Sequence, residues 1–125
     1  MKVIYIAGPY RDKTICRTLD NIRFAERGAK LVWKTHNIAI CPHLNTRLFD
    51  DVTKPEIFLE GYLELVRRCD ALALLPGWEG SMGTVAEYEL AEELGIPVIM
   101  IPLAYLISQT DSAIATFKEE INAKC

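Results

Sequence analysis

The sequence lacks the patterns that mark zinc sites, disulfide frameworks and membrane spans. Its four cysteines are scattered, with no CxxC and no nearby pair of histidines, so neither a zinc site nor a compact disulfide framework is predicted. No apolar run approaches the ~20 residues that span a bilayer, and the stretch Met1–Ala7 is too short for a signal sequence. We therefore expect a soluble, cytoplasmic protein with free thiols, no metal and no cofactor.

A strong excess of charge of either sign is also missing. Lys and Arg number 14 against 17 Asp and Glu, and the net charge of -3 argues against binding to polymeric nucleic acid. This net charge is compatible with a small anionic ligand, because helix N-termini and local basic groups hold phosphate on acidic proteins. Neither GxGxxG nor GxxxxGK[ST] occurs, so no dinucleotide site or P-loop is indicated.

The chain instead shows short apolar runs that alternate with helical patterns. Strands are expected at Lys2–Ala7, Ile38–Cys41, Ala71–Leu75 and Pro97–Ile101, and helices at Ile15–Asn37, Thr53–Arg68, Thr84–Leu94 and Asp111–Ala123. The helix ends are marked by a capping box at Thr53–Glu56, by Gly95 after the third helix and by Asp111 or Ser112 as the cap of the last helix. An irregular loop is expected at His43–Val52. Apolar strands that alternate with helices form parallel sheets covered on both faces. We therefore predict a single domain over residues 1–125, a three-layer α/β fold of flavodoxin or Rossmann type. Its sheet would have four or five parallel strands in the order 2-1-3-4 or similar.

Three segments are expected at one edge of this sheet, because ligands of open parallel sheets bind beyond the carboxyl ends of the strands. They are Gly8–Arg11, Pro42–Asn45 and Pro76–Glu87. In the first, Gly8 gives space, Tyr10 could hydrogen-bond a reacting carboxylate, and Arg11 is either a phosphate ligand or a solvated surface charge. In the second, His43 and Asn45 either meet a sugar or base or are bonded locally.

The third segment is a glycine-rich loop that turns into a helix carrying Glu87. Thr84-Val-Ala-Glu87 fits a capping box, so one interpretation is that Glu87 only accepts the Thr84 N–H. In the other, the loop lets a ligand approach closely and the helix dipole keeps Glu87 ionised as a nucleophile. Trp78 is either a stacking platform for a base or a lid packed on the core. Ser81 either donates a hydrogen bond to a ligand or is a turn residue.

These residues resemble the nucleoside 2-deoxyribosyltransferase-like superfamily, most closely its short bacterial and phage branch, which is DUF4406-like. The likeness covers nearly the whole chain and rests on Gly8-Pro9-Tyr10, Cys69–Trp78, Ser81-x-Gly83, Glu87, Ala91 and Gly95-Ile-Pro97. It implies that Glu87 is the nucleophile that attacks C1′ of a 2-deoxynucleoside or its monophosphate. The resemblance also implies that Ser81, an Asp in relatives acting on free nucleosides, helps to hold a phosphate.

A second acid is implied about eight residues before Asp70, where this sequence has Tyr62. Glu60 and Glu64 flank that position, and either could substitute. The resemblance further implies a homodimer or higher oligomer in which a polar residue near the partner's C-terminal region completes each site. Three residues are possible equivalents, namely Ser108, Ser112 and Asn122.

Gly83-Thr-x-x-Glu87 is also similar to a motif of the lysine-decarboxylase-like phosphoribohydrolases, although Pro76-Gly-Trp lacks their paired glycines. Both resemblances imply N-glycosidic chemistry. The first implies an N-glycosidase or deoxyribosyltransferase with a covalent glycosyl-Glu87 intermediate and a nucleoside or nucleotide substrate. The catalytic candidates are Glu87, Glu60, Glu64 and Tyr10, and the substrate-binding candidates are Gly8, Pro9, Arg11, His43, Asn45, Trp78, Ser81 and Gly83. The alternative is a non-catalytic nucleotide-binding or sensing domain on the same fold.

Overall fold

The computed structural model describes residues 1–125 and contains one sheet of four parallel strands in the order β2-β1-β3-β4. The strands are β1 (Val3–Ala7), β2 (Ile38–Ile40), β3 (Ala71–Leu74) and β4 (Val98–Met100). The helices are α1 (Ile15–Lys34), α2 (Pro42–Asn45), α3 (Pro55–Arg67), α4 (Met82–Leu94), α5 (Leu103–Ile107) and α6 (Asp111–Lys124), with a 3-10 turn η1 (Trp78–Gly80). The predicted fold class and strand order are confirmed.

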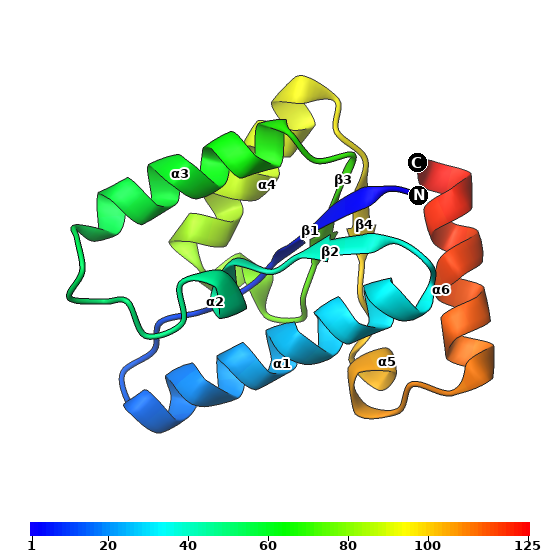
Figure 1. Ribbon diagram of the computed structural model, residues 1–125, viewed down its shortest axis with the longest axis horizontal. Coiled ribbons are helices and arrows are strands. Elements are labelled where there is room, and N and C mark those ends of the chain that lie inside the picture. Colours follow the sequence, from blue (N-terminus) through cyan, green and yellow to red (C-terminus); the bar gives the residue numbers. More distant parts are fainter.

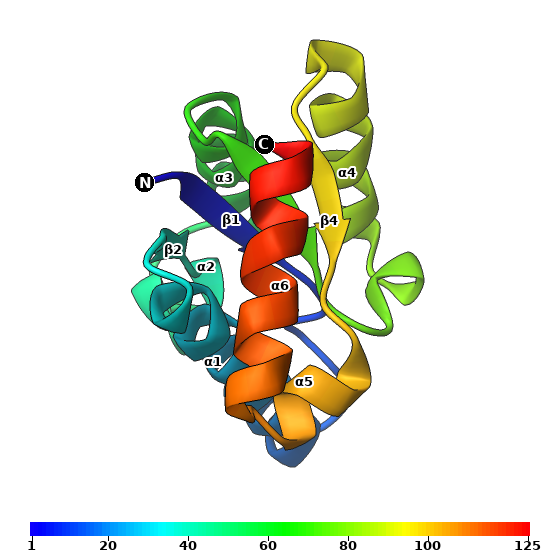
Figure 2. The same cartoon turned by 90° about the vertical axis from the view of Figure 1, so that its right-hand side faces the viewer.

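Helices cover the sheet on both sides (Figures 1 and 2). Successive side chains of a strand point to opposite faces, so β1 contributes to two cores. Ile4 and Ile6 pack with α1, α5 and α6, whereas Tyr5 and Ala7 pack with α3 and α4. Burial on both faces explains why the strand reads as a continuous apolar run in the sequence. It also points the Tyr5 side chain toward α4.

Several element boundaries differ from the predictions. The Thr53–Glu56 capping box is wrong, because α3 begins at Pro55 after Lys54 and has no side-chain cap. Proline at the first helical position has a suitable φ and lacks the N–H that a cap would satisfy. Helix α6 is capped by Thr110, whose hydroxyl accepts the Ala113 N–H at 3.1 Å, and not by Asp111 or Ser112.

Helix ends show where local backbone preferences dominate. Gly95 ends α4 as predicted, with a φ of 69° in the left-handed region that glycine adopts easily. Helix α1 ends at Lys34, before the predicted Asn37, because His36 has a φ of 65° and breaks the helical backbone. Helix α2 lies partly within the predicted loop His43–Val52, and α5 has no counterpart among the predicted helices.

The order of the strands reverses direction at β1. The chain passes from β1 to β2 on one side and then returns to β3 on the other, so β1 and β3 flank the switch point. Ligands of open α/β sheets bind at the carboxyl ends of such strands. None of the helices combines the length and apolar character needed to span a membrane.

Candidate active site

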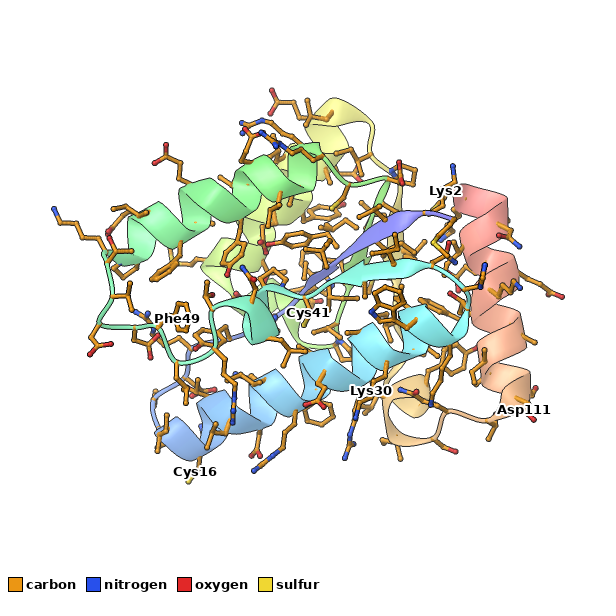
Figure 3. The ribbon with its side chains drawn as sticks, viewed as in Figure 1. Lys2, Cys16, Lys30, Cys41, Phe49 and Asp111 are labelled. Atoms are coloured by element: carbon orange, nitrogen blue, oxygen red, sulfur yellow. The ribbon has the colours of Figure 1, made fainter.

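A cleft of about 1210 Å³ opens at the carboxyl ends of β1 and β3. Its walls come from the loop after β1, from α2 and the loop that follows it, from the first half of α3 and from the start of α4. Phe49, which lines the cleft, lies on the loop between α2 and α3 (Figure 3). The structure therefore brings parts of all three predicted segments together around one cavity.

Glu87 lies deep in this cleft, on the second turn of α4, and is only 8 % exposed. The helix begins at Met82, where the Ser81 hydroxyl oxygen accepts the Thr84 N–H at 3.3 Å and the Thr84 hydroxyl at 3.0 Å. The predicted Thr84–Glu87 capping box is therefore wrong, and Glu87 does not cap the helix. Its carboxylate instead accepts a hydrogen bond from the buried Tyr5 hydroxyl.

Desolvation dominates the electrostatics of this pair. Burial raises the pKa of Glu87 from its ordinary value of 4.5 to about 7, and the hydrogen bond from Tyr5 opposes that rise. Burial and the neighbouring Glu87 carboxylate raise the pKa of Tyr5 far above its ordinary value, so this hydroxyl remains a donor. The expectation that the helix dipole keeps Glu87 ionised is wrong, because the dipole acts within the first turn and Glu87 lies beyond it.

The loop after β1 closes one side of the cleft. A Cβ on Gly8 would lie 2.6 Å from Cδ1 of Leu75, so only glycine permits this close approach. The Tyr10 hydroxyl oxygen accepts the N–H of Leu48 at 2.8 Å and thus holds the loop that follows α2. Tyr10 lines the cleft, but the hydrogen-bond partner of the Glu87 carboxylate is Tyr5, a residue that the sequence did not single out.

Acidic groups predominate among the charged residues that line the cleft. Arg11 is the only basic side chain there besides His43, and it pairs with Asp50 at 3.1 Å across the loop that follows α2. Asp12, Asp50 and Glu56 also line the cleft. No three His, Cys, Asp or Glu side chains of the chain gather as a metal-binding group. A phosphate in the cleft would therefore meet an arginine that already has a carboxylate partner.

His43 lies in the cleft wall and is 5 % exposed. Its Nε2 lies 2.9 Å from the carbonyl oxygen of Pro9, which only accepts, so Nε2 carries the hydrogen. Burial lowers the pKa of His43, and its Nδ1 is buried without a partner. Nδ1 is thus an acceptor. Asn45, the other candidate of this segment, is exposed and lies outside the lining.

The two predicted acids of α3 do not reach the cleft. Glu60 and Glu64 are exposed and are absent from its lining, and Glu64 pairs with Arg68 at 2.9 Å. They lie four residues apart and therefore on the same outward face of the helix. The carboxylate that α3 does contribute to the lining is Glu56, in the first turn of the helix.

Tyr62 lines the cleft from α3 and is half-buried. Its hydroxyl is hydrogen-bonded to the Thr46 hydroxyl and lies 3.3 Å from the carbonyl oxygen of Pro42. The helical repeat of apolar residues was the signal for this orientation, since Phe58, Leu59, Tyr62, Leu65 and Val66 recur at the spacing of one buried face. The corresponding signal for Tyr5 was a phenol within an otherwise apolar strand, which requires a buried hydrogen-bond partner.

Trp78 lies outside the cleft lining, in η1. Its ring stacks on Tyr88 with centroids 4.9 Å apart, and it packs against the core between the sheet and helices α3 and α4. The structure therefore shows Trp78 packed on the core and not as a stacking platform that faces a ligand. Ser81 and Gly83 do line the cleft, and the Ser81 hydroxyl keeps its own hydrogen available for a ligand because it only accepts from Thr84.

The fold is similar to that of a solved 2-deoxyribosyltransferase from the psychrotolerant bacterium Bacillus psychrosaccharolyticus, described as a biocatalyst for the synthesis of nucleosides. The TM-score is 0.60 at 16% sequence identity, and the match covers 78% of this chain and 70% of that chain. No curated protein matches the chain in sequence. The model of a domain of unknown function, DUF7768, matches residues 2–101, while the DUF4406-like branch stays a prediction. The chain therefore belongs to the DUF7768 family and has the fold of a 2-deoxyribosyltransferase.

Proposed function

We propose that this protein cleaves the N-glycosidic bond of 2′-deoxynucleosides or their 5′-monophosphates, with Glu87 as the nucleophile. One observation carries the proposal: a buried carboxylate lies in the cleft at the switch point of the sheet, and its position is held by a buried tyrosine hydroxyl. The fold shared with a 2-deoxyribosyltransferase supports the same chemistry. Perturbed carboxylates in clefts are also typical of catalytic sites.

The reaction would proceed in two steps. An ionised Glu87 oxygen attacks C1′, the C1′–N bond breaks, and its electron pair leaves with the base, which takes up a proton. The glycosyl-Glu87 intermediate then reacts with water, which completes hydrolysis, or with a second base, which completes transfer. The pKa of about 7 leaves about half of the Glu87 side chains ionised at neutral pH. Tyr5 would orient the attacking oxygen.

The direct test is to incubate the protein with a panel of deoxynucleosides and deoxynucleoside monophosphates and to measure released base by chromatography. The Glu87→Gln variant keeps the shape of the side chain and removes the nucleophile, so we expect turnover to be lost. Glu64→Gln is the matched control, since Glu64 lies outside the cleft. Full turnover by Glu87→Gln would exclude the mechanism. Mass spectrometry of the wild type after rapid quenching should show one added deoxyribosyl group.

The charges of the cleft bear on the choice between nucleoside and monophosphate. Asp50→Ala would free Arg11 and remove a carboxylate, so we expect it to lower the KM of monophosphates and leave that of nucleosides unchanged. Asp20→Ala is the control, because Asp20 forms a similar exposed ion pair with Arg23 away from the cleft. The shift should weaken at high salt. Equal effects of both variants on both substrates would contradict a phosphate site at Arg11.

The alternative function is nucleotide binding or sensing without catalysis. The position of Glu60 and Glu64 outside the cleft favours it, because the expected second carboxylate is then missing. A binding domain would release no base but would gain thermal stability from a deoxynucleoside or its monophosphate. The assembly as a homodimer or higher oligomer, completed by Ser108, Ser112 or Asn122, stays a prediction.

A further inference from the structure

The reaction proposed above needs a proton for the departing base, and neither Glu60 nor Glu64 faces the cleft to provide it. We propose that the hydroxyl of Tyr62 is the general acid that protonates the leaving base and the general base of the second step. The proposal rests on the proposed function, since it assigns a residue to that reaction.

The position of Tyr62 supports this role. It projects into the same cleft as Tyr5 and Glu87 and packs against the core cluster that contains Tyr5. A nucleoside bound at Glu87 would therefore occupy the cavity that Tyr62 also lines.

The hydrogen bonds of Tyr62 leave its proton available. Three oxygens form a small cluster: Tyr62 and Thr46 hydroxyls are bonded to each other, and they lie 3.3 Å and 3.4 Å from the carbonyl oxygen of Pro42. When Thr46 donates to Tyr62, the Tyr62 hydrogen has only the long contact to Pro42 as its acceptor. A base nitrogen entering the cleft competes well with such a contact. The Thr46 hydroxyl then stabilises the phenolate that forms.

The proton that Tyr62 gives up in the first step returns to it in the second. In the first step the Tyr62 O–H bond breaks as the C1′–N bond breaks, and the proton joins the nitrogen lone pair of the base. In the second step the Tyr62 phenolate takes a proton from the attacking water or from the N–H of the acceptor base. The C1′–O bond to Glu87 breaks at the same time, which restores both side chains.

The remaining carboxyls of the lining are placed less well. Glu56 precedes Tyr62 by six residues, about 9 Å along the axis of α3, and it is exposed to solvent. Asp50 is held in its ion pair with Arg11, and Asp12 lies 3.9 Å from Arg17, both at the exposed surface. Tyr62 is thus the half-buried proton donor that α3 contributes to the lining of the cleft.

The test compares 2′-deoxyguanosine with 7-methyl-2′-deoxyguanosine, whose base carries a positive charge and leaves without being protonated. For Tyr62→Phe we expect kcat/KM for deoxyguanosine to fall by about 10²-fold or more, with little change for the methylated substrate after its spontaneous hydrolysis is subtracted. Tyr88→Phe is the matched control, because Tyr88 lies outside the cleft lining. Thr46→Val removes the donor to the phenolate and should show the same selectivity with a smaller loss.

Equal losses on both substrates would overturn the proposal and leave Tyr62 as a structural link between α3 and α2. Unchanged cleavage of deoxyguanosine by Tyr62→Phe would overturn it as well. If Tyr62→Phe fails to fold, the Thr46→Val ratio between the two substrates decides in the same way. If the wild type cleaves neither substrate nor any other deoxynucleoside, the proposed function itself fails, which is a different outcome from the failure of Tyr62 alone.

Discussion

Replacement of the buried carboxyl by an amide, Glu87→Gln, should change how stability depends on pH. The pKa of Glu87 is about 7 in the folded protein, against an ordinary value of 4.5. At about 1.4 kcal/mol per pKa unit, ionising this buried group costs about 3 kcal/mol of folding free energy. Because the folded-state pKa is raised, the stability associated with neutral Glu87 is fully present below pH 4.5 and is lost as pH rises through 7.

Glutamine keeps the side-chain length and can still accept the Tyr5 hydroxyl hydrogen, but it does not titrate. The unfolding free energies of the two proteins should therefore run in parallel below pH 4.5 and diverge between pH 4.5 and 7. Above that range the variant gains about 3 kcal/mol relative to the wild type. Urea titrations followed by circular dichroism at intervals from acid to mildly alkaline pH would measure this difference directly.

Glu64→Gln provides the comparison, because Glu64 is an exposed carboxylate on α3 whose loss removes only surface ion pairs with Arg67 and Arg68. Its stability should follow that of the wild type at every pH, within about 1 kcal/mol. Parallel curves for Glu87→Gln and the wild type throughout would refute the reasoning, since they would mean that burial does not raise the pKa of Glu87. The expected nucleophile would then be ionised well below neutral pH.

Two further variants test the parts that hold Glu87 and the cleft. Tyr5→Phe removes the hydrogen bond that lowers the pKa of Glu87, so the acidic limb of kcat/KM should move up by one to two pH units, the equivalent of a charged hydrogen bond worth roughly 1.5–3 kcal/mol. A limb that stays in place would show that Tyr5 does not act on the carboxylate. Gly8→Ala places a methyl group against Leu75 and should destabilise the protein by about 1–3 kcal/mol in urea titrations. Gly61→Ala, with no atom within 4 Å of the added carbon, should instead stabilise α3 by about 0.5–1 kcal/mol, and equal effects of the two substitutions would contradict the packing argument.

Local sequence patterns predicted the sheet and the end of α4 better than the starts of helices. The alternation of apolar runs with helices was enough to predict the parallel sheet, because a strand buried on both faces must be covered by helices. Glycine at Gly95 predicted the end of α4, since the left-handed backbone there is a local property. Helix starts were predicted less well, because Ser81 and Thr84 both offer a hydroxyl for capping and the structure uses Ser81.

The sequence by itself determined the α/β fold, and it placed the candidate carboxylate Glu87 at the edge of the sheet where the cleft opens. Tertiary structure decided which groups meet that carboxylate. Tyr5 reaches it across 82 residues of sequence, and no periodicity within β1 or α4 links the two. The rotation of α3 about its own axis, set by which face packs on the core, turned Glu60 and Glu64 outward and brought Tyr62 into the cleft. Burial then set the charge of Glu87, because desolvation depends on every atom around the carboxyl and not on its neighbours in sequence.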